Sequence, residues 1–134
     1  MEQDYTESFG RYLFSKRSPQ MSMSELGRRL DISPGYVCDL EHGRKYPPSN
    51  DIVERIAEVL SLDDSERELF LDLAGKGRRE VSADLPEYIM YSDVGDTVRL
   101  ALRTAKNSHA SVEDWLRFVD EMLAKQKTEQ LAIR

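Results

Sequence analysis

The chain has little of what metal sites and disulfide frameworks need: one cysteine, Cys38, and two histidines, His42 and His109, among 134 residues. A single cysteine excludes an internal disulfide and is typical of a reducing compartment. These three side chains do not make a convincing metal site. We therefore expect no metal and no other cofactor. No Ser-His-Asp set, glycine-rich phosphate loop or clustered carboxylate pair indicates an enzyme.

Long hydrophobic runs are also missing. No apolar stretch approaches the ~20 residues that span a bilayer, and the first residues, Met-Glu-Gln-Asp-Tyr, are too polar for a secretion signal. We expect a cytoplasmic protein without a membrane partner. Strand-like alternation, internal repeats and low-complexity tracts are absent from the sequence, and the helical patterns described below predict an all-α fold.

Residues 22–43 carry the most informative pattern, two short helices joined by a tight turn. Ser22 is a helix cap, with Glu25 three residues later as a capping box requires. Asp31 falls where the chain turns, and aspartate tolerates a positive φ. Ser33 caps the second helix and Pro34 occupies its first position. This arrangement predicts a helix-turn-helix, which inserts its second helix into the DNA major groove.

The pattern is specific enough to name a family. Residues 9–60 resemble the Cro/CI-type (Xre family) helix-turn-helix domain of phage and prophage repressors. The resemblance implies a lambda-repressor-like five-helix DNA-binding domain, completed by helices over about 52–60 and 63–75. The matching elements, spaced without gaps and followed by an apolar helix over 52–60, are Met21-Ser22, Leu26, Leu30, Ile32-Ser33, Val37, Leu40-Glu41, Gly43-Arg44 and Pro47.

The formal net charge of −6 is unusual for a DNA-binding protein, but the charge is distributed unevenly. Between positions 11 and 50 seven basic and four acidic residues give +3, which leaves −9 for the remainder. A basic face on an acidic body is an electrostatic footprint for DNA. The alternative is that these charges are ordinary solvated helix faces. We expect the acidic body to weaken nonspecific binding and make affinity steeply salt-dependent.

The resemblance places the DNA contacts on the second helix of the motif, over about 34–41. Ser33 and nearby amides would meet a phosphate, Tyr36 a phosphate, a base or a thymine methyl, and Asp39 a cytosine amino group. Pro34 and Gly35 stand where better-known members carry glutamines, so few long side chains remain for direct base readout. Shape readout or arginine contacts would then contribute more.

Further contacts are expected outside this helix. The resemblance assigns backbone phosphates to Arg44 and Lys45, and Arg28 is a further candidate. Met23 replaces a glutamine that bridges to a phosphate in many members, which leaves the Ser22 cap and the helix amides at this end. The alternative for Met23 is a partly exposed hydrophobic residue.

Three residues are interpreted as structural. The family pairs a glutamate at the position of Glu41 with a basic residue, and we expect Lys16 to be that partner and to orient the two helices. Cys38 lies near the DNA-facing surface, where Asp39 and Glu41 would disfavour a thiolate, so we expect a small half-buried residue rather than a redox switch.

The remaining pattern divides the chain into a DNA-binding domain over 1–75, a polar linker over 76–84 and a helical C-terminal region over 85–134. In the domain, a helix from about residue 6 or 7 to 17 would bury Phe9, Leu13 and Phe14. The helix from Asp63 would bury Leu69, Phe70, Leu73 and Ala74 and end at Gly75. In the C-terminal region, a helical turn begins at Pro86, Asp93 caps a helix over about 94–107, and Ser111 with Asp114 caps a last helix to about residue 129.

The last helix carries an apolar stripe that includes the only tryptophan. It packs either on residues 85–105 of the same subunit or on a second subunit. Proteins of the Cro/CI type usually bind pseudo-palindromic sites as dimers, so we expect dimerisation through the stripe. Its residues are Trp115, Leu116, Val119, Met122 and Leu123.

Two functions from different classes follow. The first is a transcriptional regulator, a homodimeric repressor of phage or prophage type that binds double-stranded DNA. The second is an antitoxin-type protein that binds a toxin through its C-terminal helices and autoregulates its operon. A neighbouring toxin gene would favour the second. A neighbouring metallopeptidase gene would favour a repressor whose partner is a regulatory protease.

Overall fold

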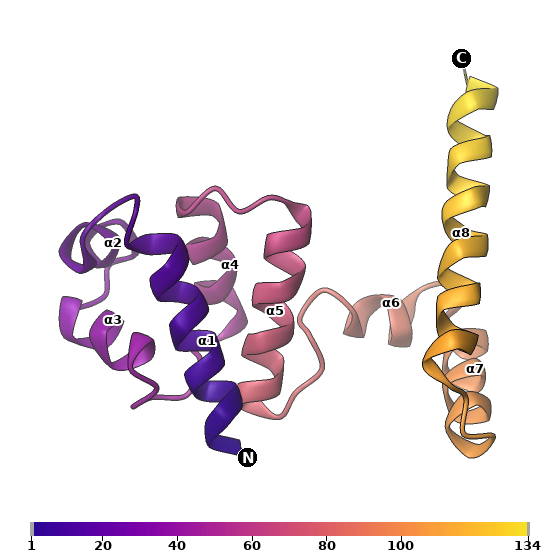
Figure 1. Cartoon of the computed structure of the whole chain (residues 1–134), viewed down its shortest axis with the longest axis horizontal. Coiled ribbons are helices and arrows are strands. Elements are labelled where there is room, and N and C mark those ends of the chain that lie inside the picture. Colours follow the sequence, from indigo (N-terminus) through magenta and orange to yellow (C-terminus); the bar gives the residue numbers. More distant parts are fainter. Residues whose placement is uncertain (1, 134) are drawn as a thin grey trace. The chain divides into compact units, whose positions relative to one another are not determined.

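The computed structural model consists of eight helices in its described part and contains no strand there (Figure 1). It describes the backbone of residues 2–133 and the side chains of residues 5–133. The outer ends of the two predicted regions, residues 1 and 134, lie outside this range. The helices are α1 (Glu2–Arg17), α2 (Met23–Leu30), α3 (Pro34–Glu41), α4 (Asn50–Val59), α5 (Asp64–Arg78), α6 (Pro86–Tyr91), α7 (Gly95–Asn107) and α8 (Val112–Ile133).

The chain divides into two compact units, Met1–Tyr88 and Ile89–Arg134, called unit 1 and unit 2 here. Unit 1 holds a hydrophobic core in which α1 packs against α3 and α5. Phe9 stacks on Phe70 with ring centroids 4.7 Å apart. Every buried hydrophobic side chain of the described residues lies in this unit: Phe9, Leu13, Leu26, Leu30, Val37, Leu40, Val53, Ile56, Ala57, Leu60, Phe70, Leu71 and Ala74.

Two of the predicted core positions are wrong. Phe14 is 50% exposed and Leu69 is 47% exposed, whereas Leu71 is buried. Successive residues of a helix are turned by about 100°, so the inward face holds positions three and four apart. Phe9 and Leu13 occupy that face of α1, and residue 14 is rotated away from it.

The end of α5 also differs from the prediction. The helix does not stop at Gly75 but continues to Arg78, and Arg79 terminates it with a left-handed φ of 61°. Part of the predicted linker over 76–84 is therefore helical. The rest is held against α5: the Glu80 amide donates to the Gly75 carbonyl at 2.8 Å, and the Ser82 hydroxyl donates to Asp72.

Unit 2 lacks a core of its own. Gly95 is its only buried residue in the described range, and no hydrophobic side chain there is buried. Arg99 on α7 donates to the carbonyls of Ile89 and Met90, which ties α7 to the end of α6. Helices α6, α7 and α8 are thus formed, but they bury no hydrophobic cluster together.

The starts of these helices match the prediction in two of three cases. α6 begins at Pro86. At α8, the Ser111 amide donates to Asp114 Oδ2 at 2.9 Å, and the Asp114 amide donates to Ser111 Oγ at 3.1 Å, a reciprocal cap. The predicted Asp93 cap of α7 is wrong, because Val94 occupies the N-cap and makes no side-chain cap bond.

Candidate nucleic-acid interface

The first helix of the motif, α2, is capped as predicted by Ser22, whose Oγ accepts from the Glu25 amide at 3.1 Å. The reciprocal half of the capping box is replaced, because the Glu25 carboxylate accepts from Arg28 and Arg29 instead. After α2, Asp31 adopts the left-handed conformation expected of it, with a φ of 57°. The turn into α3 is therefore determined by local chemistry.

The second helix, α3, presents its N-terminal end to solvent. Ser33 Oγ accepts from the Tyr36 amide at 3.0 Å, and Pro34 stands in the first turn. Ser33, Pro34 and Gly35 are exposed and Tyr36 is half-buried. Positive backbone dipole and unpaired amides gather at a helix N-terminus, which is favourable for a phosphate.

The opposite side of α3 anchors it to unit 1. Val37 and Leu40 are buried, and the backbone of α1 approaches very closely at Gly10. A Cβ at position 10 would lie 2.3 Å from the Leu40 carbonyl oxygen and 2.6 Å from that of Glu41. Only glycine fits at this crossing, a requirement that sequence reasoning missed.

The partner of Glu41 was predicted wrongly. Arg17, not Lys16, forms the ion pair: Nη2 donates to Glu41 Oε1 at 2.8 Å, and Nε donates to Oε2. Nη1 donates to the Met21 carbonyl at 2.9 Å. The two-pronged geometry is one that lysine cannot make. Both side chains are buried, so this fork connects α1, α3 and the segment before α2.

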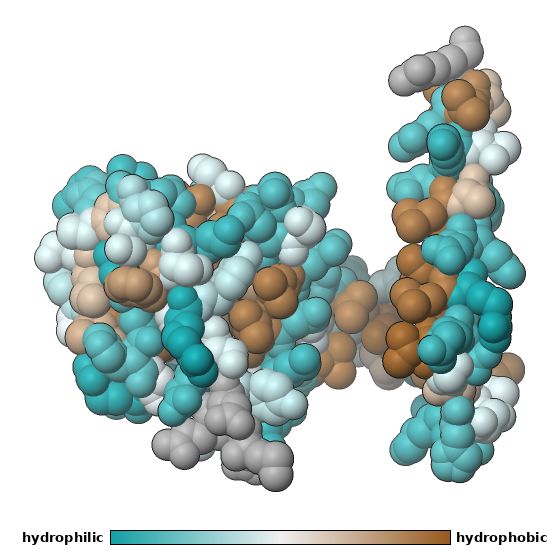
Figure 2. Space-filling model, in the orientation of Figure 1, coloured by the Kyte–Doolittle hydropathy of each residue, from teal (hydrophilic) through white to brown (hydrophobic). Residues whose placement is uncertain are grey.

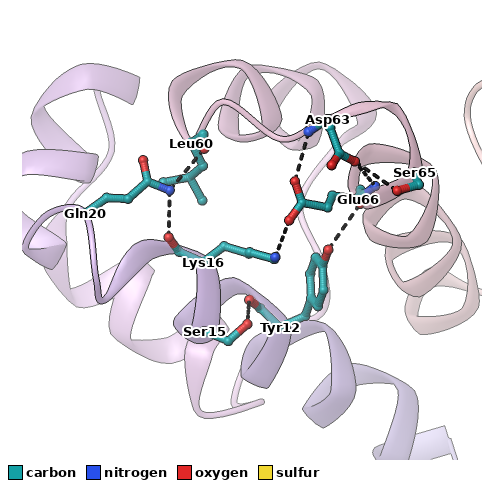
Figure 3. A network of polar contacts seen from close by, with 8 residues as sticks. All are labelled: Tyr12, Ser15, Lys16, Gln20, Leu60, Asp63, Ser65 and Glu66. Atoms are coloured by element: carbon teal, nitrogen blue, oxygen red, sulfur yellow. Dashed lines mark hydrogen bonds and ion pairs between the residues drawn. The ribbon is translucent and has the colours of Figure 1, made fainter.

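Lys16 points to another helix. Figure 3 shows it directed at Glu66 on α5, while Gln20 donates to the Leu60 carbonyl at 3.0 Å and Tyr12 donates to the Glu66 carbonyl at 3.4 Å. The hydrogen bond to Glu66 raises the pKa of Lys16, and the same bond lowers the pKa of Glu66. Lys16 therefore stabilises the contact of α1 with α5. It is not available to DNA in this arrangement.

The cations of the motif are mostly compensated. Of the seven basic residues between positions 11 and 50, six have a carboxylate partner within 4 Å. Lys45 is exposed and has no such partner among the described residues. Hydrogen bonds from Arg28, and to a smaller extent from Arg29, lower the pKa of Glu25 to about 2. The basic face expected from the sequence is thus smaller than the charge count indicates.

Arg44 occupies a position next to α3. Its Nε donates to Asp39 Oδ1 at 2.9 Å, and its Nη2 lies 3.3 Å from Cys38 Sγ. The hydrogen bond with Asp39 raises the pKa of Arg44. The pair neutralises the acidic side chain on α3, a pairing that sequence reasoning missed. Cys38 is half-buried as expected, but its contacts are Arg44 and His42 Nδ1, at 3.5 Å.

Met23 at the start of α2 is half-buried and packs on the core, which fits the alternative of a partly exposed hydrophobic residue. Arg28, at the other end of α2, stays largely exposed despite its contact with Glu25.

The five residues expected to mediate dimerisation all lie on α8 and remain between 38% and 57% exposed. Figure 2 shows hydrophobic atoms gathered along one side of this helix. The alternative, burial against residues 85–105 of the same chain, is not realised: in the described range neither Trp115 nor any of the other four is buried. Trp115 instead contacts Phe118 of its own helix edge to face, with centroids 6.3 Å apart.

Comparison with known proteins agrees with this geometry. Residues 9–70 match the family model described as a helix-turn-helix domain, which spans α2, α3 and α4 with parts of α1 and α5. No curated protein and no solved structure matches the chain. The match supports a DNA-binding regulator of the helix-turn-helix class, a class that is typically not enzymatic. In the described part of the chain, no helix is long and apolar enough to cross a membrane, and no cluster of three potential metal ligands occurs.

Proposed function

We propose that the chain is a sequence-specific transcriptional regulator of the Cro/CI (Xre) type, with a lambda-repressor-like arrangement of α1 to α5. It binds a pseudo-palindromic operator as a homodimer and represses transcription. The observation that carries the proposal is the exposed N-terminal end of α3, capped by Ser33 and fixed from behind by the buried Arg17–Glu41 pair.

The proposed contacts divide by chemistry. Ser22, Ser33 and the amides that follow them bind phosphates at two helix N-termini. Tyr36 contacts a base or a thymine methyl from the exposed part of its ring. Pro34 and Gly35 let the backbone approach the groove without long side chains.

The cationic contacts come from the ends of both helices. Lys45 binds a phosphate directly, and Arg28 does so beside Glu25. Arg44 exchanges its bond with Asp39 for a bond with a phosphate, and Asp39 is then free to accept from a cytosine. Met23 contributes packing at the start of α2 rather than a hydrogen bond.

One observation favours a second function. The apolar side of α8 is as suitable for a partner protein as for a second copy, which is what an antitoxin-type protein or the target of a regulatory protease would require. In that case the DNA-binding domain would autoregulate the operon.

Footprinting of the purified protein on the DNA upstream of its own gene, at several salt concentrations, tests the proposal. Two protected half-sites separated by about one helical turn, ~10 base pairs, are expected of a homodimer. Unlocalised binding that disappears at moderate salt would contradict sequence-specific regulation and favour a protein as the main target.

A further inference from the structure

The apolar side of α8 is long, continuous and uncovered. Six large side chains on it are between 38% and 70% exposed, and no extensive packing joins α8 to α6 or α7 in the described part. Soluble monomers rarely leave such a contiguous patch open to water. The residues are Val112, Trp115, Leu116, Val119, Met122 and Leu123.

Five of these six residues are arranged symmetrically about Val119; the exception is Val112, whose counterpart seven positions after Val119 is Gln126. Leu116 and Trp115 precede it by three and four positions, and Met122 and Leu123 follow it by three and four. Positions three and four apart share one side of a helix. A second α8 running in the opposite direction through the same midpoint would therefore place each half of the stripe on the other half.

The charges beside the stripe also distinguish the two directions. Among the charges of α8, Glu113 and Asp114 lie in the first turn, Asp120 lies next to the midpoint, and Lys125 and Lys127 lie about three turns after the first, with Glu129 beyond them. Antiparallel helices place the acidic turn of each copy beside the basic turn of the other. Parallel helices would place acids beside acids, an arrangement that costs free energy.

We propose that α8 pairs with α8 of a second copy in an antiparallel register centred on Val119. This inference rests on the homodimer of the proposed function and defines its interface. In this register Leu116 contacts the partner's Leu123, Val119 contacts the partner's Val119, and Glu113 lies near the partner's Lys127.

Disulfide cross-linking of the full chain tests the direction. Leu116→Cys and Leu123→Cys are prepared separately in a Cys38→Ser background, one with a longer tag, then mixed and oxidised. The mixture is expected to give the cross-linked heterodimer. Neither variant alone is expected to form a cross-linked homodimer. In the antiparallel register the same residue of the two copies is offset by six positions for residue 116 and by eight for residue 123, about 9–12 Å along the axis. This exceeds the ~7 Å limit for the Cα atoms of a disulfide.

Val119→Cys is the positive control, since it meets itself in either direction. Cross-links confined to the single-variant samples would overturn the antiparallel register. A full chain that sediments as a monomer would overturn the pairing altogether.

Charge reversal provides a second readout. Glu113→Lys and Lys127→Glu are each expected to weaken dimerisation by about two- to tenfold at low salt, and their combination to restore it. Glu121→Lys, on the opposite side of α8, is the matched control and should leave the dimer unchanged. Additive weakening in the double variant would contradict the proposed contact.

The cross-linking experiment and the footprinting experiment can fail independently of each other. A cross-linked antiparallel dimer without an operator footprint would contradict DNA-dependent regulation and leave the pairing intact. A footprint with two half-sites from a chain that forms only parallel cross-links would support DNA-dependent regulation and contradict the antiparallel pairing.

Discussion

At the residue scale, the buried Arg17–Glu41 pair is the most constrained contact of unit 1. Each side chain is less than a tenth exposed. Arg17→Met would leave the Glu41 carboxylate buried without its partner, and removal of one member of a buried pair typically costs ~3–5 kcal/mol. We expect a decrease of that size in the free energy of unfolding of unit 1, measured by urea titration of the full chain.

The double variant Arg17→Met/Glu41→Leu is the control for this prediction. Replacing both members removes the uncompensated charge, so much of the lost stability should return. Arg17→Lys should fall between the wild type and Arg17→Met, because lysine keeps the charge but not the two-pronged geometry. Equal stability of all four proteins would show that the pair does not stabilise the fold.

Glu25 should make stability depend on acid. Its pKa is about 2 in the folded chain, against 4.5 for the ordinary side chain, because Arg28 and then Arg29 donate to it. The unfolded chain therefore takes up this proton first as the pH falls. The stabilisation is complete above about pH 4.5 and is lost as the pH falls towards 2.

We expect Glu25→Gln to reduce the loss of thermal stability between pH 5 and pH 2, followed by circular dichroism. Glu58→Gln, at an exposed position of α4 without an ion-pair partner among the described residues, is the control. An unchanged pH profile in Glu25→Gln would mean that the carboxylate is not held by the two arginines in solution.

Arg44 and Asp39 should have opposite effects on DNA binding. Arg44→Ala removes a proposed phosphate contact, so affinity should fall similarly for all sequences and the salt slope should decrease by about 1. Asp39→Asn should strengthen nonspecific binding, because it removes an acid near the phosphates and releases Arg44. Fluorescence anisotropy at several salt concentrations measures both, with Arg11→Ala as the matched arginine control.

At the scale of the helix, the caps predict which serines matter. Ser33 accepts a hydrogen bond from the Tyr36 amide, whereas Ser49 at the start of α4 makes no side-chain cap bond. Ser33→Ala should therefore lower the free energy of unfolding by about 1 kcal/mol and weaken DNA binding. Ser49→Ala is the matched control, and we expect it to change neither the free energy of unfolding nor the DNA affinity appreciably. Equal effects of the two variants would contradict a specific role for the α3 cap.

Several helix starts were predictable because a cap involves only a few neighbouring residues, although α1 begins at Glu2 rather than near residue 6 and Asp93 does not cap α7. The Ser33 cap, the Asp31 turn and the helix start at Asp63 are confirmed, and Asp63 forms a complete capping box with Glu66. The direction in which each side chain leaves its helix was harder to predict. Lys16 and Arg17 are neighbours in the sequence, but their side chains point about 100° apart around the helix axis. This difference determines which of them reaches Glu41.

Contacts between distant segments were not readable from the sequence. Gly10 is required only because the α3 backbone passes close to α1. The Arg44–Asp39 pair joins positions only five apart, but it depends on the path of the chain after α3, where Gly43 has a φ of 71°. The DNA-contact residues were assigned through the family resemblance. The structure adds two facts about them: the N-terminal end of α3 is exposed, and most of the basic residues near it are paired with carboxylates.

At the scale of the whole chain, the two units differ in how they are stabilised. Unit 1 buries all thirteen buried hydrophobic residues of the described part, and unit 2 buries none. A set of amphipathic helices without a core gains stability only when another surface covers its apolar side. This contrast predicts that unit 1 folds without unit 2, whereas dimerisation requires unit 2.

A chain ending at Tyr88 tests this contrast. It keeps Ser82 and Ala83, which contact α5 and the core, so its unfolding should remain cooperative and similar to that of unit 1 in the full chain. By sedimentation it should be a monomer, and its operator affinity should fall because the second half-site no longer contributes. Val119→Arg in the full chain should give the same two results without a deletion. If the shortened chain still sediments as a dimer, the contact between copies lies in unit 1, and the exposed side of α8 would be left for a different protein.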